Sequence, residues 1–157
     1  MPITPVNDPS PLLIIRATEW AEQQSLFILG TGNPLNADEI ALASSVGVVN
    51  PEHIRIVTIE QIPFPDDTQL LNMATNAGLL TSNLAGLTLG YGIFIRHNHY
   101  TARLLSHEFR HVYQYEQAGT MSAFLADYLH QIVRYGYEAA PLEEDARIHE
   151  VREPQRL

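Results

Sequence analysis

The chain of 157 residues contains no cysteine and no lysine, since all nine of its Lys+Arg residues are arginines. The absence of cysteine excludes disulfides, thiolate metal sites and cysteine nucleophiles, but it does not decide the redox compartment. The absence of lysine excludes the lysine of a phosphate-binding P-loop and a Schiff base on a side chain. Catalytic chemistry is therefore confined to histidine, carboxylate, hydroxyl and guanidinium groups.

Positive charge is also scarce. Nine arginines stand against 18 Asp+Glu residues, which gives a formal net charge of -9 and a pI near 5.1. Nucleic-acid binding needs clustered basic residues that neutralise phosphates, and anionic membranes attract the same residues. The composition therefore disfavours both nucleic acids and membrane surfaces as partners.

Long apolar segments are missing as well. The stretch from Thr68 to Ile95 carries no charged residue, but Asn72, Asn76 and several Gly and Thr residues make it too polar for a bilayer interior. The first residues contain prolines in place of the basic region and apolar stretch of a secretory signal. We therefore expect a cytoplasmic location.

The length and the hydrophobic fraction of 45% predict one folded domain. Residues 1–10 are rich in proline, and we expect them to form a flexible arm. Residues 11–157 are expected to form the domain itself. No internal repeat or low-complexity segment interrupts it.

Hydrophobic periodicity and the positions of capping residues, Gly and Pro predict the secondary structure. The expected helices cover residues 11–30, 36–46, 66–77, 98–117, 121–135 and 141 to the C-terminus, and the expected strands cover residues 53–59 and 87–95. The predicted fold class is α+β, with a small antiparallel or mixed sheet in the middle and a helical C-terminal half.

The most informative stretch is His107-Glu108-Phe109-Arg110-His111. On a helix, residues four apart lie one above the other, so both imidazoles can reach one zinc ion. The carboxylate of Glu108 can then contact a zinc-bound water without binding the metal, and zinc lowers the pKa of such a water. A surface helix with two stacked histidines is the alternative interpretation.

A catalytic zinc normally has three protein ligands and one open position. The metzincin arrangement requires a histidine at position 117, where this chain has Gln117. The gluzincin arrangement takes a glutamate from a later helix, and Glu143 is the best candidate because it lies in the acidic first turn of the expected helix after Pro141. An acidic first turn that only complements the helix dipole is the alternative. Further candidates for the third ligand are Glu144 and, behind it, Glu138, Asp127 and His130.

The chain resembles the compact gluzincins, or minigluzincins, and other families with an HExxHxxQ helix. The resemblance rests on the motif from His107 to Gln114, on Gly119 and on the segment from Pro141 to Ala146. It covers roughly residues 87–147, whereas the N-terminal third of the chain resembles no family. It implies a zincin-like domain over residues 11–157 and a zincin-like C-terminal half.

The resemblance also implies the roles of single residues. In those families the two motif histidines and the downstream glutamate bind zinc, and the motif glutamate is the general base. Carried over, His107, His111 and Glu143 would be the zinc ligands and Glu108 the base. Related gluzincins often place an aspartate four residues after the ligand glutamate to orient a ligand histidine, but this chain has Arg147 there. That orienting contact must therefore come from another residue.

Two further features bear on substrate binding. Enzymes of this kind hold an extended peptide on an edge strand, and Gly90 and Gly92 would leave the face of the expected strand 87–95 open to close approach. A tightly packed or bulged strand is the alternative. Donors for a developing oxyanion would come from Tyr137, Tyr113, His97, His99 or Arg110, of which the two histidines are also possible extra ligands.

These residues favour a zinc-dependent hydrolase, with a metallopeptidase that acts on a peptide or protein as the leading hypothesis. A catalytically inactive, zinc-stabilised binding module with a zincin-like fold is the alternative, because Arg147 departs from the family pattern and the oxyanion donor is unassigned. A metal-free helical interaction domain is the third hypothesis.

Overall fold

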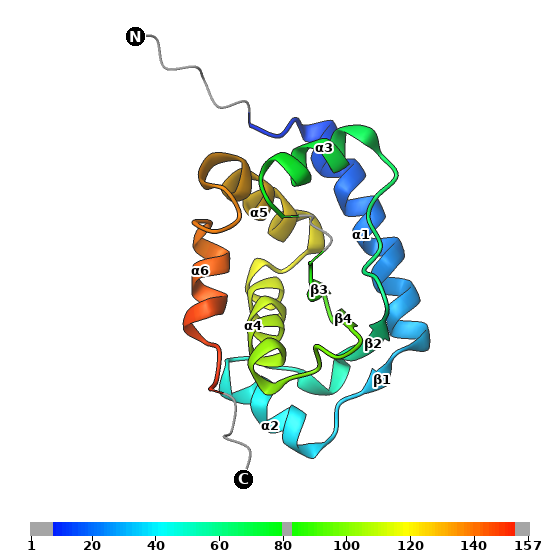
Figure 1. The fold of residues 1–157 in the computed structure, drawn as a ribbon, viewed down its shortest axis with the longest axis vertical. Helices are drawn as coiled ribbons and strands as arrows, with labels where there is room; N and C mark the ends of the chain where they lie inside the picture. The colour runs from blue at the N-terminus through cyan, green and yellow to red at the C-terminus, as the bar shows by residue number, and fades with distance from the viewer. Residues whose placement is uncertain (1–7, 80–82, 153–157) are drawn as a thin grey trace.

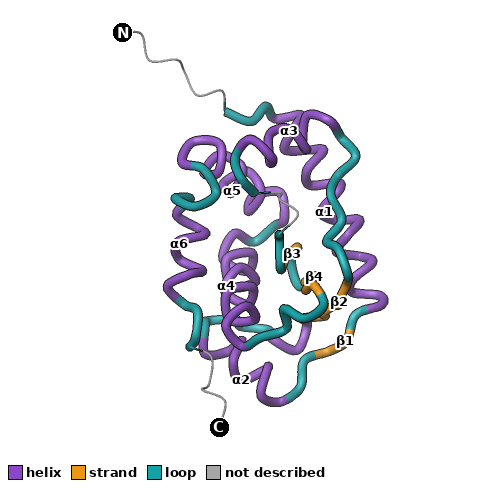
Figure 2. The backbone as a smooth tube through the Cα atoms, viewed as in Figure 1, coloured by secondary structure: helices purple, strands orange, loops and turns teal. Residues whose placement is uncertain are grey.

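The computed structural model describes residues 8–79 and 83–152. Within this part of the chain the fold is α+β, with a four-stranded mixed sheet and a helical C-terminal half, as the sequence predicted (Figures 1 and 2). In chain order the elements are α1 (Pro11–Thr31), β1 (Asn33–Pro34), α2 (Ala37–Ser45), η1 (Pro51–His53), β2 (Arg55–Ile59), α3 (Thr68–Asn76), β3 (Gly86–Leu89), β4 (Gly92–Arg96), α4 (Ala102–Ala118), α5 (Met121–Tyr135) and α6 (Pro141–Ile148). Most of the proline-rich arm expected over residues 1–10 lies outside the described residues.

The sheet has the strand order β1-β2-β4-β3. The central pair β2 and β4 runs parallel, and both outer strands pair antiparallel with their neighbours. Strand β3 is therefore an edge strand, and helix α4 packs beside it.

Two hydrophobic clusters lie on opposite faces of the sheet. Because successive side chains of a strand point to opposite faces, the residues of β4 divide between the clusters. Phe94 packs with Ile28 of α1 on one face, in a cluster that also includes residues of α5. Ile93 and Ile95 pack on the other face, with Phe109 of α4. The sheet thus lies between α1 and α4, which places the motif helix against the core (Figure 1).

Several helix boundaries follow the predicted capping residues. The side chain of Asn36 accepts the backbone N–H of Glu39, and the Glu39 carboxylate accepts the N–H of Asn36, which completes a capping box at the start of α2. Asp67 caps α3, and Gly119 and Gly136 end α4 and α5. The expected strand 53–59 begins two residues later, because residues 51–53 form a short 3-10 helix.

The prediction of one strand over residues 87–95 is wrong. The segment is a hairpin, in which Leu89 of β3 pairs with Gly92 of β4 and the chain reverses at Gly90 and Tyr91. Gly90 has a φ of +70°, a conformation that favours glycine at the first turn position of a two-residue hairpin. The reversal turns β3 into the edge strand beside α4.

The last helix is shorter than predicted. It ends at Ile148 and does not continue to the C-terminus. The backbone N–H of Val151 instead donates to Ser106 Oγ on α4, at 2.9 Å. Tertiary contacts with α4 therefore replace the last expected helical turns over residues 149–152, and residues 153–157 lie outside the described part.

Among residues 8–79 and 83–152, no helix combines the length and the apolar character that a membrane span requires.

Candidate metal centre

Helix α4 brings the two motif histidines together. The helix begins after Thr101, whose side chain accepts the backbone N–H of Leu104, and it continues without interruption to Ala118. His107 and His111 are both buried, with ring centroids 4.9 Å apart. The four-residue spacing thus presents both imidazoles on one face of the helix, and this face points into the molecule.

Glu143 reaches the same point from α6. Its Oε1 lies 3.1 Å from Nε2 of His107, and its Oε2 lies 3.1 Å from Nε2 of His111. Only 2% of Glu143 is exposed, although it is a carboxylate. Within the described residues, His107, His111 and Glu143 form the group of side chains whose donor atoms converge closely enough to hold one metal ion.

The ring of His111 is oriented by an amide. Nδ1 of His111 lies 2.7 Å from Oε1 of Gln114, while the Gln114 amide nitrogen donates to the carbonyl oxygen of Leu142 and to Oδ2 of Asp145. Both partners of that nitrogen are acceptors, so the oxygen of Gln114 must face the histidine and accept a hydrogen bond from Nδ1. Nε2 of His111 is consequently left to face Glu143. Arg110 donates to the same Asp145 and holds it in place.

The ring of His107 is oriented by a carboxylate. Nδ1 of His107 donates to Oε2 of Glu150 at 2.8 Å, and Nε of Arg103 donates to Oε1 of Glu150 at the same distance. Glu150 lies just past the end of α6, where the chain turns back onto α4. A carboxylate behind a histidine fixes the tautomer that leaves Nε2 available for a metal. Glu150 therefore makes the orienting contact that the resemblance assigns to the position occupied here by Arg147.

In the metal-free chain the charges of His107, His111 and Glu143 shift one another's pKa values. Burial alone would lower the pKa of His111, but the adjacent Glu143 carboxylate outweighs this effect and raises the pKa to about 9. The pKa of His107 is also raised, against its burial, by the hydrogen bond to Glu143 and by the charge of Glu108. Burial would raise the pKa of Glu143. The charge of His111 and the hydrogen bonds that Glu143 accepts from the surrounding side chains instead hold that pKa well below the usual range. Without a metal, protons on the imidazoles thus balance the buried carboxylates.

These residues fit a zinc ion. Two imidazole nitrogens and one carboxylate are a donor set that catalytic zinc sites use. One donor atom from each of the three residues lies within 4.8 Å of the others. Each oxygen of Glu143 lies 3.1 Å from one of the two Nε2 atoms, Oε1 from His107 and Oε2 from His111, close to the separation of about 3.3 Å between tetrahedral ligands with zinc bonds of about 2.0–2.1 Å. Both histidines also have their Nδ1 atoms bonded to oxygen acceptors, so each presents Nε2 to the centre. The ion would replace the imidazole protons as the balancing positive charge.

Glu108 lies beside the ligand set without belonging to it. Its Oε2 accepts a hydrogen bond of 2.6 Å from the hydroxyl of Thr88 on β3. Its Oε1 faces Gly86 on the same strand, where a Cβ atom would lie only 2.7 Å away. A side chain at position 86 would therefore displace the carboxylate. The edge strand positions Glu108, with glycine where the two elements approach most closely.

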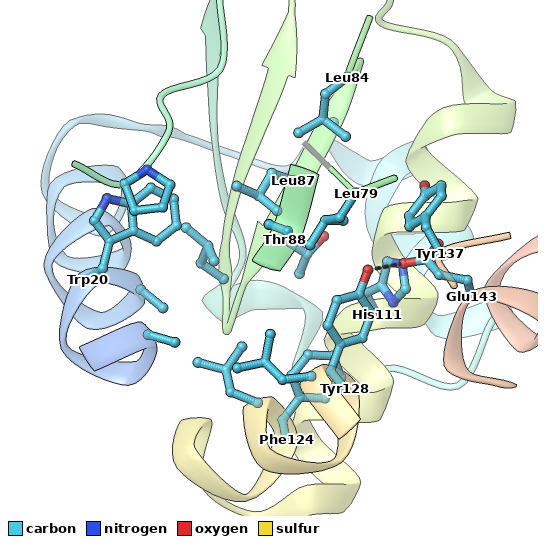
Figure 3. Close-up of a pocket in the computed structure, with 18 of the residues that line it drawn as sticks. Trp20, Leu79, Leu84, Leu87, Thr88, His111, Phe124, Tyr128, Tyr137 and Glu143 are labelled. Atoms are coloured by element: carbon cyan, nitrogen blue, oxygen red, sulfur yellow. Dashed lines mark hydrogen bonds and ion pairs between the residues drawn. The ribbon is translucent and has the colours of Figure 1, made fainter. Parts of the chain in front are cut away.

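Two tyrosines complete the surroundings of Glu143 (Figure 3). The hydroxyl of Tyr128, on α5, donates to Oε2 of Glu143 at 2.6 Å. Tyr137, in the loop before α6, also hydrogen-bonds Glu143, and burial raises the pKa of both phenols. Both phenols therefore stay protonated near neutral pH and act as donors. Of the predicted oxyanion donors, Tyr137 is the one that lies at the centre.

The other predicted site residues lie elsewhere. His97 is exposed and does not line either cavity that adjoins the centre. His99 turns its Nδ1 to the carbonyl oxygen of His97, and Tyr113 stacks on Arg110. The alternative third ligands are exposed or paired away from the centre: Glu144, Glu138 and Asp127 are exposed, and His130 lies near Asp8.

Gly90 and Gly92 do not leave an open face next to the centre. Gly90 forms the hairpin turn at the far end of β3, near Met121 and Ser25. A Cβ at Gly92 would lie 3.0 Å from Ile28, so this residue allows β4 to pack against α1. The predicted close approach to the site occurs at Gly86 instead.

Two cavities meet at the centre. One has a volume of about 100 Å³ and lies among α1, α3, α5 and β3, with His107, His111 and Glu143 in its wall. The other has a volume of about 420 Å³ and lies beside α4 and the loop after α3, with Arg103, Arg147 and Glu150 in its wall. Both are lined by His107, Glu108 and Tyr137. Both cavities thus adjoin the centre.

Only some of the residues that surround the candidate metal ligands could be predicted from the sequence. Gln114 follows His111 by three residues, so helical spacing alone places it next to that ring. Thr88, Tyr128 and Glu150 gave no such signal, because their contacts arise only when β3, α5 and the segment after α6 pack against the motif helix.

No family model, no curated protein and no solved structure matches this chain, so the assignment of a function depends on the geometry of the centre.

Proposed function

We propose that this protein is a zinc-dependent hydrolase, and that it acts as a metallopeptidase. The observation that carries the proposal is the convergence of His107, His111 and Glu143 on one point, with Glu108 next to them and outside the ligand set. Three protein ligands leave one coordination position for water or substrate.

A zinc ion in such a centre polarises a substrate carbonyl and lowers the pKa of water. The residues of the chain supply the remaining steps. Glu108 accepts a proton from the attacking water and passes it to the nitrogen of the leaving amine, and the hydrogen bond from Thr88 holds its carboxylate in place. Tyr137 lines both cavities, and its protonated phenol is the candidate donor to the oxyanion, for which it would exchange its hydrogen bond to Glu143.

The edge strand β3 supports a peptide as the substrate. Its residues Gly86 to Leu89 line the smaller cavity, next to the centre. An extended peptide can pair with such an edge, although the carbonyl oxygen of Thr88 already accepts the hydroxyl of Tyr115 at 3.2 Å. The backbone groups of Leu87 and Leu89 face β4, so a peptide would pair with the outward groups of Gly86 and Thr88.

Metal content and hydrolysis test the proposal in two variants. Glu108→Gln should retain about one equivalent of zinc and lose hydrolysis of a peptide library, because the amide cannot accept the proton. His111→Ala should lose the tightly bound zinc, whereas His99→Ala, which alters a half-buried loop histidine outside the centre, should retain it.

Zinc below half an equivalent in the wild type would contradict the proposal. If wild-type protein bound zinc tightly but cleaved no peptide, the centre would be that of a zinc-stabilised binding module instead.

A further inference from the structure

The smaller cavity is mainly apolar where it extends away from the centre. Its walls come from α1, α3, α5 and β3 and include Trp20, Leu70, Met73, Leu84, Leu87 and Leu129 (Figure 3). The walls formed by α1 and α3 lie outside residues 87–147, to which the resemblance to gluzincins is confined. The cavity is therefore a feature of this chain that the HExxH motif does not imply.

Three hydroxyl groups in its wall already have partners in or next to the centre. The hydroxyl of Thr88 is bonded to Glu108, that of Tyr115 to the carbonyl oxygen of Thr88, and that of Tyr128 to Glu143. These hydroxyls are thus committed to neighbouring groups, and the space beyond them is bounded mainly by carbon. A ligand that enters it gains free energy by removing its own apolar surface from water.

We propose that this cavity receives the side chain of a substrate residue next to the scissile bond and that it selects a branched aliphatic side chain such as leucine. The inference rests on the proposed zinc hydrolase, since it places the scissile bond at the metal centre. His111 and Glu143 line the cavity on the side away from Trp20 (Figure 3), so a side chain seated in the cavity positions the adjoining carbonyl beside the centre.

The volume limits the size of that side chain. An apolar cavity of about 150 Å³ in another protein holds one benzene molecule. The cavity here, of about 100 Å³, is smaller and suits an aliphatic side chain better than an aromatic ring. Burial of a leucine side chain in such a site corresponds to about 10- to 100-fold in affinity relative to glycine.

Small residues keep the cavity open. Ala17 and Ala21 on α1 and Ala74 on α3 are buried and line it. A leucine at position 74 would extend into the space that the substrate side chain would occupy. Ala74→Leu should therefore reduce the preference for leucine without altering the zinc ligands.

The test measures the dissociation constants of N-acetyl amino-acid hydroxamates for zinc-loaded wild-type protein, because the hydroxamate group binds zinc without being cleaved. The leucine compound should bind about 10- to 100-fold more tightly than the glycine compound, and more tightly than the tryptophan compound. In Ala74→Leu the advantage of leucine over glycine should fall at least fivefold. Ala123→Leu, at an exposed position of α5 outside the cavity, should behave as wild type.

Equal affinities for the glycine, leucine and tryptophan compounds, in protein that holds one zinc, would overturn the cavity proposal and leave the zinc centre intact. A stronger preference for long linear acyl hydroxamates would also overturn it, since the cavity would then belong to a lipid-like substrate. Absence of bound zinc would instead overturn the hydrolase proposal. The wild-type series decides the question even if Ala74→Leu does not fold.

Discussion

Removal of the Glu150 carboxylate is expected to weaken zinc binding, although this residue is not a ligand. Its Oε2 accepts a hydrogen bond of 2.8 Å from Nδ1 of His107, and this bond fixes which nitrogen faces the metal. Its Oε1 is held by Arg103, so the carboxylate itself has a defined orientation. Without Glu150 the ring of His107 can rotate or change its tautomer, and both changes reduce the fraction of the protein that is ready to bind zinc.

The expected magnitude follows from the role of such contacts in zinc sites. Loss of a residue that orients a ligand histidine typically costs 10- to 100-fold in metal affinity, which corresponds to about 1.4–2.7 kcal/mol. Glu150→Ala should show a loss in this range. Glu150→Gln should lose less, because the amide oxygen still accepts the proton of Nδ1 but carries no charge.

The assay is a competition titration of zinc between the protein and a chromophoric chelator. Glu144→Ala is the matched control, since Glu144 lies on the exposed side of α6 and carries the same charge. The melting temperature of the metal-free protein separates a local loss of zinc affinity from general destabilisation. A zinc dissociation constant within twofold of wild type in Glu150→Ala would refute the reasoning.

Three further predictions concern the residues around the centre. Gly86→Ala should retain zinc but lower the rate of hydrolysis by about 100-fold, because the new Cβ would lie 2.7 Å from Oε1 of Glu108. Gly30→Ala is the control, since a Cβ at position 30 meets nothing within 4 Å. Equal activity of the two variants would contradict the prediction. Tyr128→Phe should weaken zinc binding by about tenfold in the same titration, since the hydrogen bond of 2.6 Å to the Glu143 carboxylate is worth about 1.5 kcal/mol; an unchanged affinity would argue against a supporting role. In the metal-free chain Glu143 raises the pKa of His111 from its ordinary value of 6.5 to about 9, in spite of burial. The stability that the charge of His111 contributes is therefore complete below about pH 6.5 and is lost as the pH rises through 9. Zinc must displace this proton and any proton on His107, so the apparent zinc affinity should increase at least tenfold per pH unit between pH 7 and 8, and calorimetry in buffers of different ionisation enthalpy should detect at least one released proton at pH 7.

The parts of the centre that depend on local spacing were predictable from the sequence. Helix α4 carries His107, Glu108 and His111 at positions fixed by the helical repeat, and Gly119 ends it as expected. The position of Glu143 followed from the resemblance to gluzincins, and the structure brings it to both histidines. The α+β class followed from the hydrophobic pattern.

The parts that depend on long-range packing were not predictable. The segment 87–95 has apolar residues on both sides of Gly90, and the pattern favoured one strand because the two-residue turn interrupts it so briefly. The missed reversal hid the contacts of Thr88 and Gly86 with Glu108. Helical periodicity likewise extended the last helix to the C-terminus, whereas contacts with α4 end it at Ile148 and place Glu150 behind His107.

Anomalous scattering at the zinc edge, from crystals of protein purified without added metal, tests the zinc centre most directly. We predict one strong peak within bonding distance of Nε2 of His107, Nε2 of His111 and the carboxylate of Glu143, about 2.0–2.2 Å from each atom. No peak between these three side chains, or a zinc ion bound by other residues, would contradict the account.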